Sequence, residues 1–262
     1  MNITLFTSNK SRHNYLINLL SKIANKLFVI QETESLLSDM PSNHESKSLL
    51  MKKYFEHVNK AQTLFFGNPS FKNNNSNTKI LSIATGSLNN YSTTALKNFL
   101  QSDIYVVFGS SYIKGDLVKF LVKKKAINIH MGVSPYYRGT ACNFWALYDD
   151  NPHLVGATIH LLSKGLDSGP MLYHAMSHIK NDPFLYTMSA VKSAFHSVSQ
   201  KIKDDTIFKI NPIIQNKKKE IRYSRKKQFT DNILLKYFNK KINLNSKKFD
   251  KHLLKDPFFL EE

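Results

Sequence analysis

Short apolar runs alternate with amphipathic stretches over the first 130 residues of the chain. The apolar runs suited to buried strands lie at residues 3–6, 27–30, 80–84, 104–108 and 126–129. Apolar residues at three- or four-residue spacing predict helices near 15–20, over 49–66, near 91–101 and over 113–125. Strands that alternate with helices usually pair in parallel, so the sequence predicts an open, mainly parallel, twisted α/β sheet with helices on both faces.

The pattern changes after residue 150. Strand-like runs at 155–162 and 171–178 flank a connection with two glycines, which predicts an antiparallel pair at the edge of the sheet. A helix is expected over 183–203, and Lys- and Asn-rich sequence follows it. We therefore expect an α/β domain over residues 1–200 and a basic C-terminal extension over 201–262. The extension is a candidate dimerisation element, which would make the protein a homodimer, or a candidate substrate-proximal element.

The chain is strongly basic. Its 262 residues include 37 Lys and Arg against 19 Asp and Glu, a formal net charge of +18. Such a surplus favours anionic partners, although general enrichment in Lys, Asn and Ile accounts for it equally well. Cys142 is the single cysteine, which excludes an internal disulfide and indicates a reducing compartment. With neither a signal-peptide pattern nor a long apolar window, the expected location is cytoplasmic, without membrane insertion.

The candidate chemistry lies in residues 126–173. Asn128 and His130 alternate with apolar residues, so they face the same side of a strand, about 6–7 Å apart along it. They stand at its carboxyl end, where open α/β sheets bind their ligands. A loop follows, in which Tyr136 and Tyr137 are candidates to wall a pocket and Arg138 to contact an anion or brace the loop. Asp167 lies in a turn rich in Gly and Pro, which holds a carboxylate close to a neighbouring site.

These segments together resemble the formyltetrahydrofolate-dependent formyltransferase family. The family has a strand ending in Asn-Ile-His, a Tyr-Arg-Gly loop and a Leu-Asp-x-Gly turn, which correspond here to 128–130, 137–139 and 166–169. The loop departs from the commoner His-Pro-Ser opening, because His130 is followed by Met-Gly-Val-Ser. The resemblance implies a Rossmann-like fold. It covers about residues 80–180 well and the first 80 loosely, and it does not reach the tail beyond about 200.

The resemblance implies a folate-dependent N-formyltransferase without a metal, which uses formyltetrahydrofolate as cosubstrate. It places the catalytic roles on Asn128, His130 and Asp167. An asparagine amide can donate to the oxyanion that forms on the formyl group, a contribution of about 3–4 kcal/mol. Histidine can stabilise that charge or move a proton, and the aspartate can orient the histidine or accept the amine proton. The implied folate contacts are Gly109, Ser110, Ser111, Ile113 and Asp167, and the implied substrate contacts are Tyr136, Tyr137 and Arg138.

The family includes enzymes that formylate methionyl-tRNA, glycinamide ribonucleotide and nucleotide-linked amino sugars. Only about 80 residues follow the catalytic core here, and they do not predict the five-stranded C-terminal barrel of the tRNA enzymes. The loop resembles the sugar enzymes more, so the expected acceptor is a nucleotide-linked 4-amino-4,6-dideoxy sugar used in surface polysaccharide or O-antigen. The alternatives are a methionyl-tRNA formyltransferase-like enzyme and a catalytically inactive relative that binds nucleic acid.

The sequence also allows three other functional interpretations. Ser134, His130 and Asp167 could form a nucleophilic triad, but no Gly-x-Ser-x-Gly elbow is present and Pro135 removes a backbone donor. The histidines at 160, 174 and 178 suggest zinc only weakly, because a strand does not bring residues four apart together as a helix does. Residues 217–227 form the densest basic run, for which a solvated surface is favoured over nucleic-acid binding.

Overall fold

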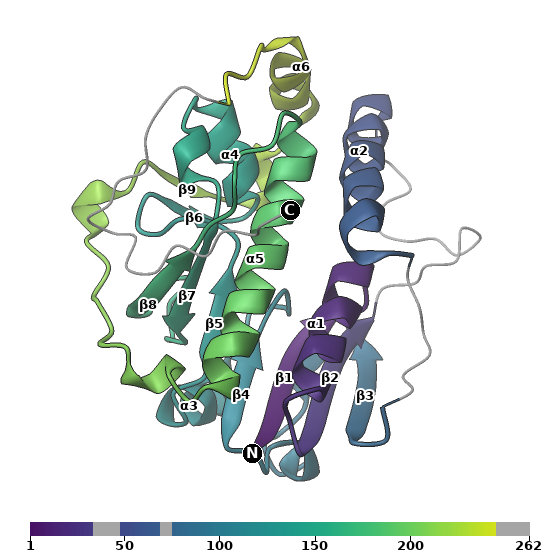
Figure 1. Ribbon diagram of the computed structural model, residues 1–262, viewed down its shortest axis with the longest axis vertical. Coiled ribbons are helices and arrows are strands. Elements are labelled where there is room, and N and C mark those ends of the chain that lie inside the picture. The colour runs from purple at the N-terminus through teal and green to yellow at the C-terminus, as the bar shows by residue number, and fades with distance from the viewer. Residues whose placement is uncertain (34–47, 69–74, 245–262) are drawn as a thin grey trace.

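The computed structural model describes residues 1–33, 48–68 and 75–244, and its centre is a seven-stranded sheet (Figure 1). The strand order is β3-β2-β1-β4-β5-β7-β8. Its strands are β1 (Asn2–Ser8), β2 (Lys26–Thr33), β3 (Thr78–Ala84), β4 (Ile104–Val107), β5 (Ile127–His130), β7 (Ala157–Leu161) and β8 (Met171–Ala175). The first five strands in this order pair in parallel, and β7 and β8 add an antiparallel edge. The predicted mainly parallel sheet and its antiparallel edge pair are both confirmed.

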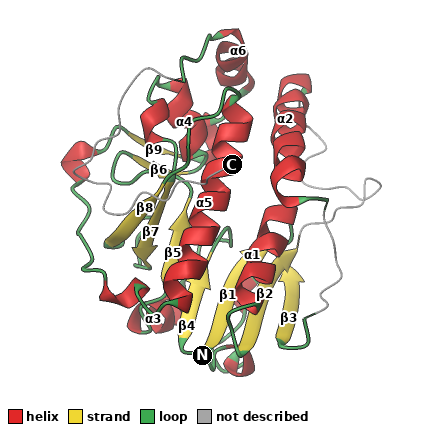
Figure 2. Ribbon diagram, viewed as in Figure 1, coloured by secondary structure: helices red, strands yellow, loops and turns green. Residues whose placement is uncertain are grey.

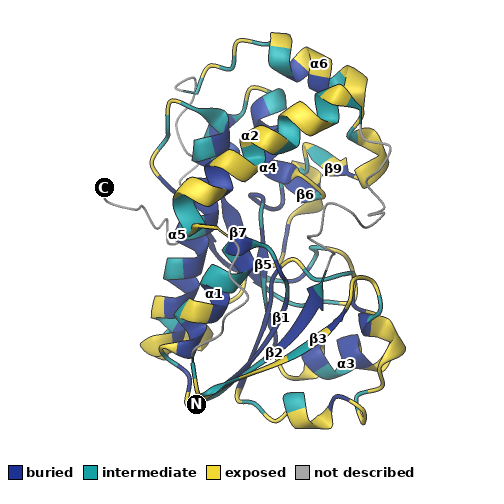
Figure 3. Ribbon diagram, turned by 90° about the vertical axis from the view of Figure 1, so that its right-hand side faces the viewer, coloured by how far each residue is buried: buried dark blue, intermediate teal, exposed yellow. Residues whose placement is uncertain are grey.

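Both faces of this sheet are covered by packed apolar residues, because side chains that alternate along one strand are buried on opposite faces. Along β4, Ile104 and Val106 pack into one apolar cluster and Tyr105 and Val107 pack into another. Figure 3 shows α1 and α5 on one side of the sheet and α3 on the other, and α2 packs against α1 and α5. The helices, coloured red in Figure 2, are α1 (Ser11–Ser21), α2 (Leu49–Phe66), α3 (Gly115–Lys123), α4 (Cys142–Tyr148), α5 (Pro183–Lys203) and α6 (Asp231–Asn239).

One predicted helix is wrong. Residues 91–101 form turns that end in a short 3₁₀ segment, Lys97–Phe99. The hydroxyl of Ser92 accepts a hydrogen bond from the backbone N–H of Ala95 at 3.1 Å, which is the local side-chain bonding that competes with a regular helix. The apolar periodicity has another cause, because Leu96 and Leu100 are buried in the cluster beneath α3.

A second, two-stranded sheet joins the active-site loop to the C-terminal part of the chain. β6 (Tyr137–Gly139) pairs in parallel with β9 (Arg222–Ser224). Beyond β9, α6 packs near α2, and its Leu234 and Tyr237 belong to the same apolar cluster as α4 and α5. Residues 245–262 of the predicted extension lie outside the described part of the chain. Among the described residues, none of the helices combines the length and apolar character that crossing a bilayer requires.

Candidate active site

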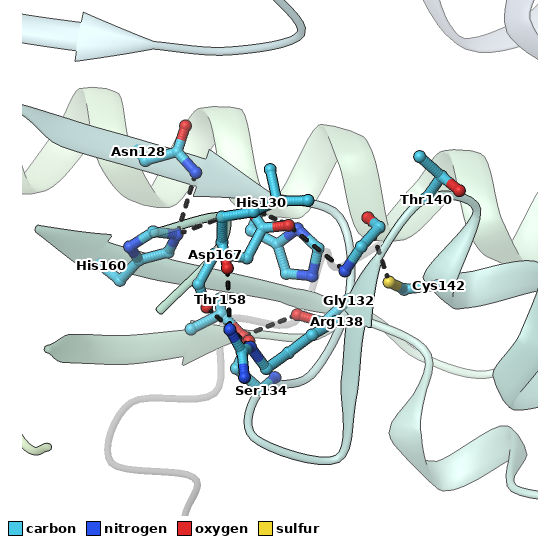
Figure 4. Close-up of polar contacts among 12 residues, drawn as sticks. Asn128, His130, Gly132, Ser134, Arg138, Thr140, Cys142, Thr158, His160 and Asp167 are labelled. Atoms are coloured by element: carbon cyan, nitrogen blue, oxygen red, sulfur yellow. Dashed lines mark hydrogen bonds and ion pairs between the residues drawn. The ribbon is translucent and has the colours of Figure 1, made fainter. Parts of the chain in front are cut away.

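The structure brings Asn128, His130 and Asp167 together at the carboxyl end of β5 (Figure 4). β5 lies between the parallel strand β4, which pairs with it as far as Asn128, and the antiparallel strand β7, which pairs with it as far as His130. The Nδ1 atom of His130 lies 3.3 Å from Oδ1 of Asp167, and both side chains are at least 90% shielded from solvent. The Nε2 atom of His130 lies 3.2 Å from the carbonyl oxygen of Tyr137, so both ring nitrogens are engaged.

The turn that carries Asp167 is held by several independent contacts. Asp167 has φ +47°, a left-handed conformation that aspartate tolerates better than most residues. Its Oδ2 atom accepts from the backbone N–H of Gly139 at 3.3 Å, and its carbonyl oxygen accepts from Arg138 Nε at 3.2 Å and Gln215 Nε2 at 2.8 Å. Gly169 has no room for a side chain, since an added Cβ would come within 1.7 Å of the Leu161 carbonyl oxygen. These contacts fix the backbone of the turn, and the turn in turn holds the Asp167 carboxylate beside His130.

The Asn128 side chain contacts His160, a residue that the sequence analysis did not select as part of the site. His160 on β7 stands directly opposite Asn128 in the strand register, and its Nε2 atom lies 2.9 Å from Asn128 Nδ2. The other ring nitrogen of His160 lies 2.9 Å from the Leu161 carbonyl oxygen, which can only accept. This pattern assigns the proton to Nδ1, so that Nε2 accepts from the Asn128 amide. One amide N–H of Asn128 is thereby engaged, and no residue in the described part of the chain accepts from the second, which can donate to a ligand.

The two histidines differ in charge because their surroundings differ. Burial alone lowers the pKa of His130, but the Asp167 carboxylate, Cys142 and the Tyr137 carbonyl oppose it and raise the pKa from 6.5 to about 10. Burial also lowers the pKa of His160, and there it prevails over Leu161 and Asp167, giving a pKa of about 4. At neutral pH the site therefore holds an imidazolium beside a carboxylate and a neutral imidazole beside an amide.

The predicted folate segment, 109–113, follows β4 at the same edge of the sheet as Asn128, which pairs with Val107. Gly109 has φ +63° and lies against the buried ring of His13. The carboxylate of Glu32, at the end of β2, accepts hydrogen bonds from the backbone N–H groups of Gly86 and Ser111. Ser110 lies beside them, and the Ile113 side chain is buried in the cluster beneath α3. Glu32, which sequence reasoning also missed, thus joins two loops across this edge.

The three predicted substrate residues have different surroundings. Tyr137 is fully buried, with its hydroxyl 2.8 Å from Asn151 Nδ2 and 3.3 Å from Asp149, so its backbone and not its ring faces the site. Arg138 is occupied in bracing the loop, with Nη2 2.8 Å from the Leu166 carbonyl oxygen and Nη1 2.9 Å from Glu220. Tyr136 is partly buried, and its carbonyl oxygen accepts from the backbone of β9.

The serine-triad and zinc readings find no support in the geometry. Ser134 is fully buried and its hydroxyl oxygen has no hydrogen-bond partner, whereas His130 faces Asp167 and Tyr137. His174 lies 2.8 Å from the Ser134 carbonyl oxygen as a buried strand residue. Within residues 1–33, 48–68 and 75–244, no three His, Cys, Asp or Glu side chains are grouped as a metal site would need.

Comparison with known proteins identifies relatives of this arrangement. Residues 85–207 match the family described as "Formyl transferase". Methionyl-tRNA formyltransferase of Thermosynechococcus vestitus is 35% identical over 91 residues, which are 35% of this chain but only 27% of that protein. The chain thus spans about a quarter of that relative.

Two solved structures are similar over most of the chain. A sugar N-formyltransferase from Shewanella has a TM-score of 0.54 at 15% identity, covering 100% of this chain and 93% of that one. The N-formyltransferase from Helicobacter canadensis, solved with folinic acid and dTDP-3-aminofucose, has a TM-score of 0.52 at 15% identity over 96% of this chain and 78% of that one. At these identities the structures show a shared fold.

Proposed function

We propose that this chain, whose residues 85–207 belong to the formyl transferase family, transfers a formyl group from formyltetrahydrofolate to the amino group of a nucleotide-linked amino-dideoxy sugar. The observation that carries the proposal is the meeting of the Asn128 amide, the His130 imidazolium and the Asp167 carboxylate at one end of β5. These groups provide a hydrogen-bond donor, a positive charge and a proton acceptor around one reacting carbon.

Each group has a distinct task in this reaction. When the amine attacks the formyl carbon, negative charge develops on the formyl oxygen, and the second amide N–H of Asn128 donates to it. Both ring nitrogens of His130 are engaged with Asp167 and Tyr137, so His130 contributes its positive charge and not a free donor. Asp167 keeps lone pairs beyond those that face His130 and Gly139, and with them it accepts the amine proton directly or through water. Collapse of the oxyanion then breaks the bond between the formyl carbon and the folate nitrogen, which takes up a proton, and tetrahydrofolate leaves.

The folate portion is proposed to bind along 109–113, beside Asn128. Gly109 brings the chain close to the core without a side chain, and Ser110 offers a hydroxyl at the sheet edge. Ile113 would contribute through its backbone, since its side chain is buried. The hydroxyl of Tyr112 in this segment donates to the carbonyl oxygen of Lys164, three residues before Asp167. Asp167 is therefore proposed to meet the folate as well as the amine.

A nucleotide-linked sugar as acceptor is supported by the share of this chain that a sugar N-formyltransferase structure matches. The sugar N-formyltransferase fold from Shewanella accounts for the chain along its whole length, including the part beyond residue 207. A second candidate acceptor is methionyl-tRNA, which is favoured by the 35% identity over 91 residues to a methionyl-tRNA formyltransferase. Formation of a homodimer and a cytoplasmic location stay predictions.

The function can be tested with a panel of acceptors. Purified protein is incubated with formyltetrahydrofolate and nucleotide-linked amino sugars of different nucleotides and amine positions, and mass spectrometry follows the gain of one formyl unit. Methionyl-tRNA is assayed in parallel. We expect formylation of a nucleotide sugar, and a loss of turnover of at least about 100-fold in Asn128→Ala, His130→Ala and Asp167→Ala. Formylation of methionyl-tRNA alone, or near-normal turnover in all three variants, would contradict the proposal.

A further inference from the structure

A dense group of cationic side chains lies next to the candidate active site. We use the name basic strip for Lys217, Lys218, Lys219, Arg225, Lys226 and Lys227, all of which are exposed. They stand on two short 3₁₀ segments, Lys217–Lys219 and Lys226–Gln228, on either side of β9. None of the six forms an ion pair with an acidic residue of the described chain.

The backbone that carries the basic strip is bound to the active-site loop. Ser224 of β9 pairs with Gly139 of β6, and the backbone N–H of Gly139 donates to the Asp167 carboxylate. Gly139 has φ +94°, and an added Cβ would lie only 2.0 Å from the Ser224 carbonyl oxygen. Just before the strip, Gln215 donates to the carbonyl oxygen of Asp167. These contacts hold the backbone that carries the basic strip beside the turn that contains Asp167.

The nearby acidic groups are already neutralised. Glu220 is paired with Arg138 at 2.9 Å, and Asp149 is paired with Arg222 at 2.7 Å. Both carboxylates near β6 and β9 are thus paired with arginines outside the basic strip, and within residues 1–33, 48–68 and 75–244 no acidic side chain forms an ion pair with the strip. Closely grouped positive charges with no counter-charge attract anions strongly.

The aromatic residue at the centre of the strip is also accessible. Tyr223 on β9 is 38% exposed, and the guanidinium groups of Arg138 and Arg225 lie 5.5 and 5.8 Å from its ring centroid. An exposed ring flanked by cations suits a ligand that combines phosphate with a planar or sugar group.

We propose that the basic strip binds the diphosphate of the acceptor, an inference that rests on the proposed function. Six residues, 220–225, separate the two 3₁₀ segments, and three of them form β9. They span at most about 20 Å when extended, a distance that one diphosphate contacted by a lysine side chain from each segment can bridge. A nucleic acid would instead require phosphate contacts distributed over a longer surface. The diphosphate anchored here would leave the sugar amine directed toward Asp167.

Binding measurements test this inference without relying on turnover. Inorganic pyrophosphate, UDP, dTDP and GDP are titrated calorimetrically into the full chain, into Lys226→Glu/Lys227→Glu and into the milder Lys226→Gln/Lys227→Gln. The matched control is Lys123→Glu/Lys124→Glu at the end of α3, which makes the same charge change at exposed lysines away from β9. Thermal melting confirms that each variant is folded.

We expect Kd for the best nucleoside diphosphate to rise at least tenfold in the Glu variant and severalfold in the Gln variant, and to stay within twofold in the control. The dependence of log Kd on log salt should also become less steep in the strip variants. Equal affinity in wild type and strip variants overturns the inference. Loss of binding to a short RNA duplex, with nucleoside diphosphate binding unchanged, overturns it in favour of nucleic acid.

The two proposals can fail separately. If no nucleotide sugar is formylated but the strip variants lose nucleoside diphosphate binding, the basic strip is upheld and the acceptor is wrong. If a nucleotide sugar is formylated with the same KM in wild type and strip variants, the acceptor is upheld and the basic strip is wrong.

Discussion

The imidazole rings of His130 and His160 lie 6.5 Å apart on neighbouring strands, and both face Oδ1 of Asp167, at 3.3 and 4.0 Å. Despite this shared neighbour, the pKa of His130 is raised to about 10 and that of His160 is lowered to about 4. The difference follows from geometry, because only His130 is close enough to the carboxylate to overcome burial. One carboxylate thus produces a charged and a neutral histidine side by side.

The raised pKa of His130 predicts a stability profile. Protonated His130 is favoured in the folded state, so its stabilising contribution is fully present below the unfolded pKa of 6.5 and is lost as pH rises through about 10. In urea denaturation at pH 6, 8 and 10, the free energy of unfolding of wild type should therefore fall relative to His130→Asn as pH rises. A difference between the two proteins that is independent of pH would contradict the assigned charge.

His160 is predicted to act by orienting Asn128. His160→Phe removes the acceptor at 2.9 Å and should lower kcat by about tenfold to a hundredfold, with a smaller change in KM. His160→Gln retains an acceptor and should recover part of the loss. The informative comparison is a double-mutant cycle, in which His160→Phe should have little further effect on kcat once Asn128 is alanine. Full additivity of the two losses would show that His160 does not act through Asn128.

Glu32 is predicted to hold the 109–113 segment in place. In Glu32→Gln only one side-chain oxygen is left to accept from the N–H groups of Gly86 and Ser111, so one of these partly solvent-accessible donors loses its protein partner, at a cost of about 0.5–1.5 kcal/mol. Steady-state kinetics should show KM for formyltetrahydrofolate raised about tenfold and kcat changed less. Glu56→Gln, at an exposed position of α2, serves as the control and should leave KM within twofold.

The ion pair between Arg222 and Asp149 is predicted to stabilise the fold. Arg222 makes two hydrogen bonds to Asp149, at 2.7 and 2.9 Å, and its guanidinium lies 4.4 Å from the Trp145 ring centroid. Arg222→Met should lower the free energy of unfolding by about 2–3 kcal/mol, measured by denaturant titration. By contrast, Lys209→Met removes an exposed pair with Asp205 and should cost less than about 1 kcal/mol. Equal losses in the two variants would argue against a special role for Arg222.

Most of the sheet could be predicted because its central strands, such as β1 and β4, are buried on both faces and appear as continuous apolar runs. Asn128 and His130 lie on the same side of β5 because side chains alternate along a strand. The position of Asp167 beside them was implied only by the family resemblance. His160 could not be found in this way, because its place opposite Asn128 depends on the register of β5 and β7, which apolar patterning does not specify. The division at residue 200 stays a prediction.

The short pairing of β6 with β9 also bears on how this chain can change over evolution. The family match ends at residue 207, yet Gly139, whose N–H donates to Asp167, lies in a strand that pairs with a second strand starting at Arg222. Replacing the C-terminal part with that of a relative would therefore also replace β9, which supports the backbone next to Asp167. Loop and tail should covary as a unit, and chimaeras joined between them should lose activity even where both parents are active.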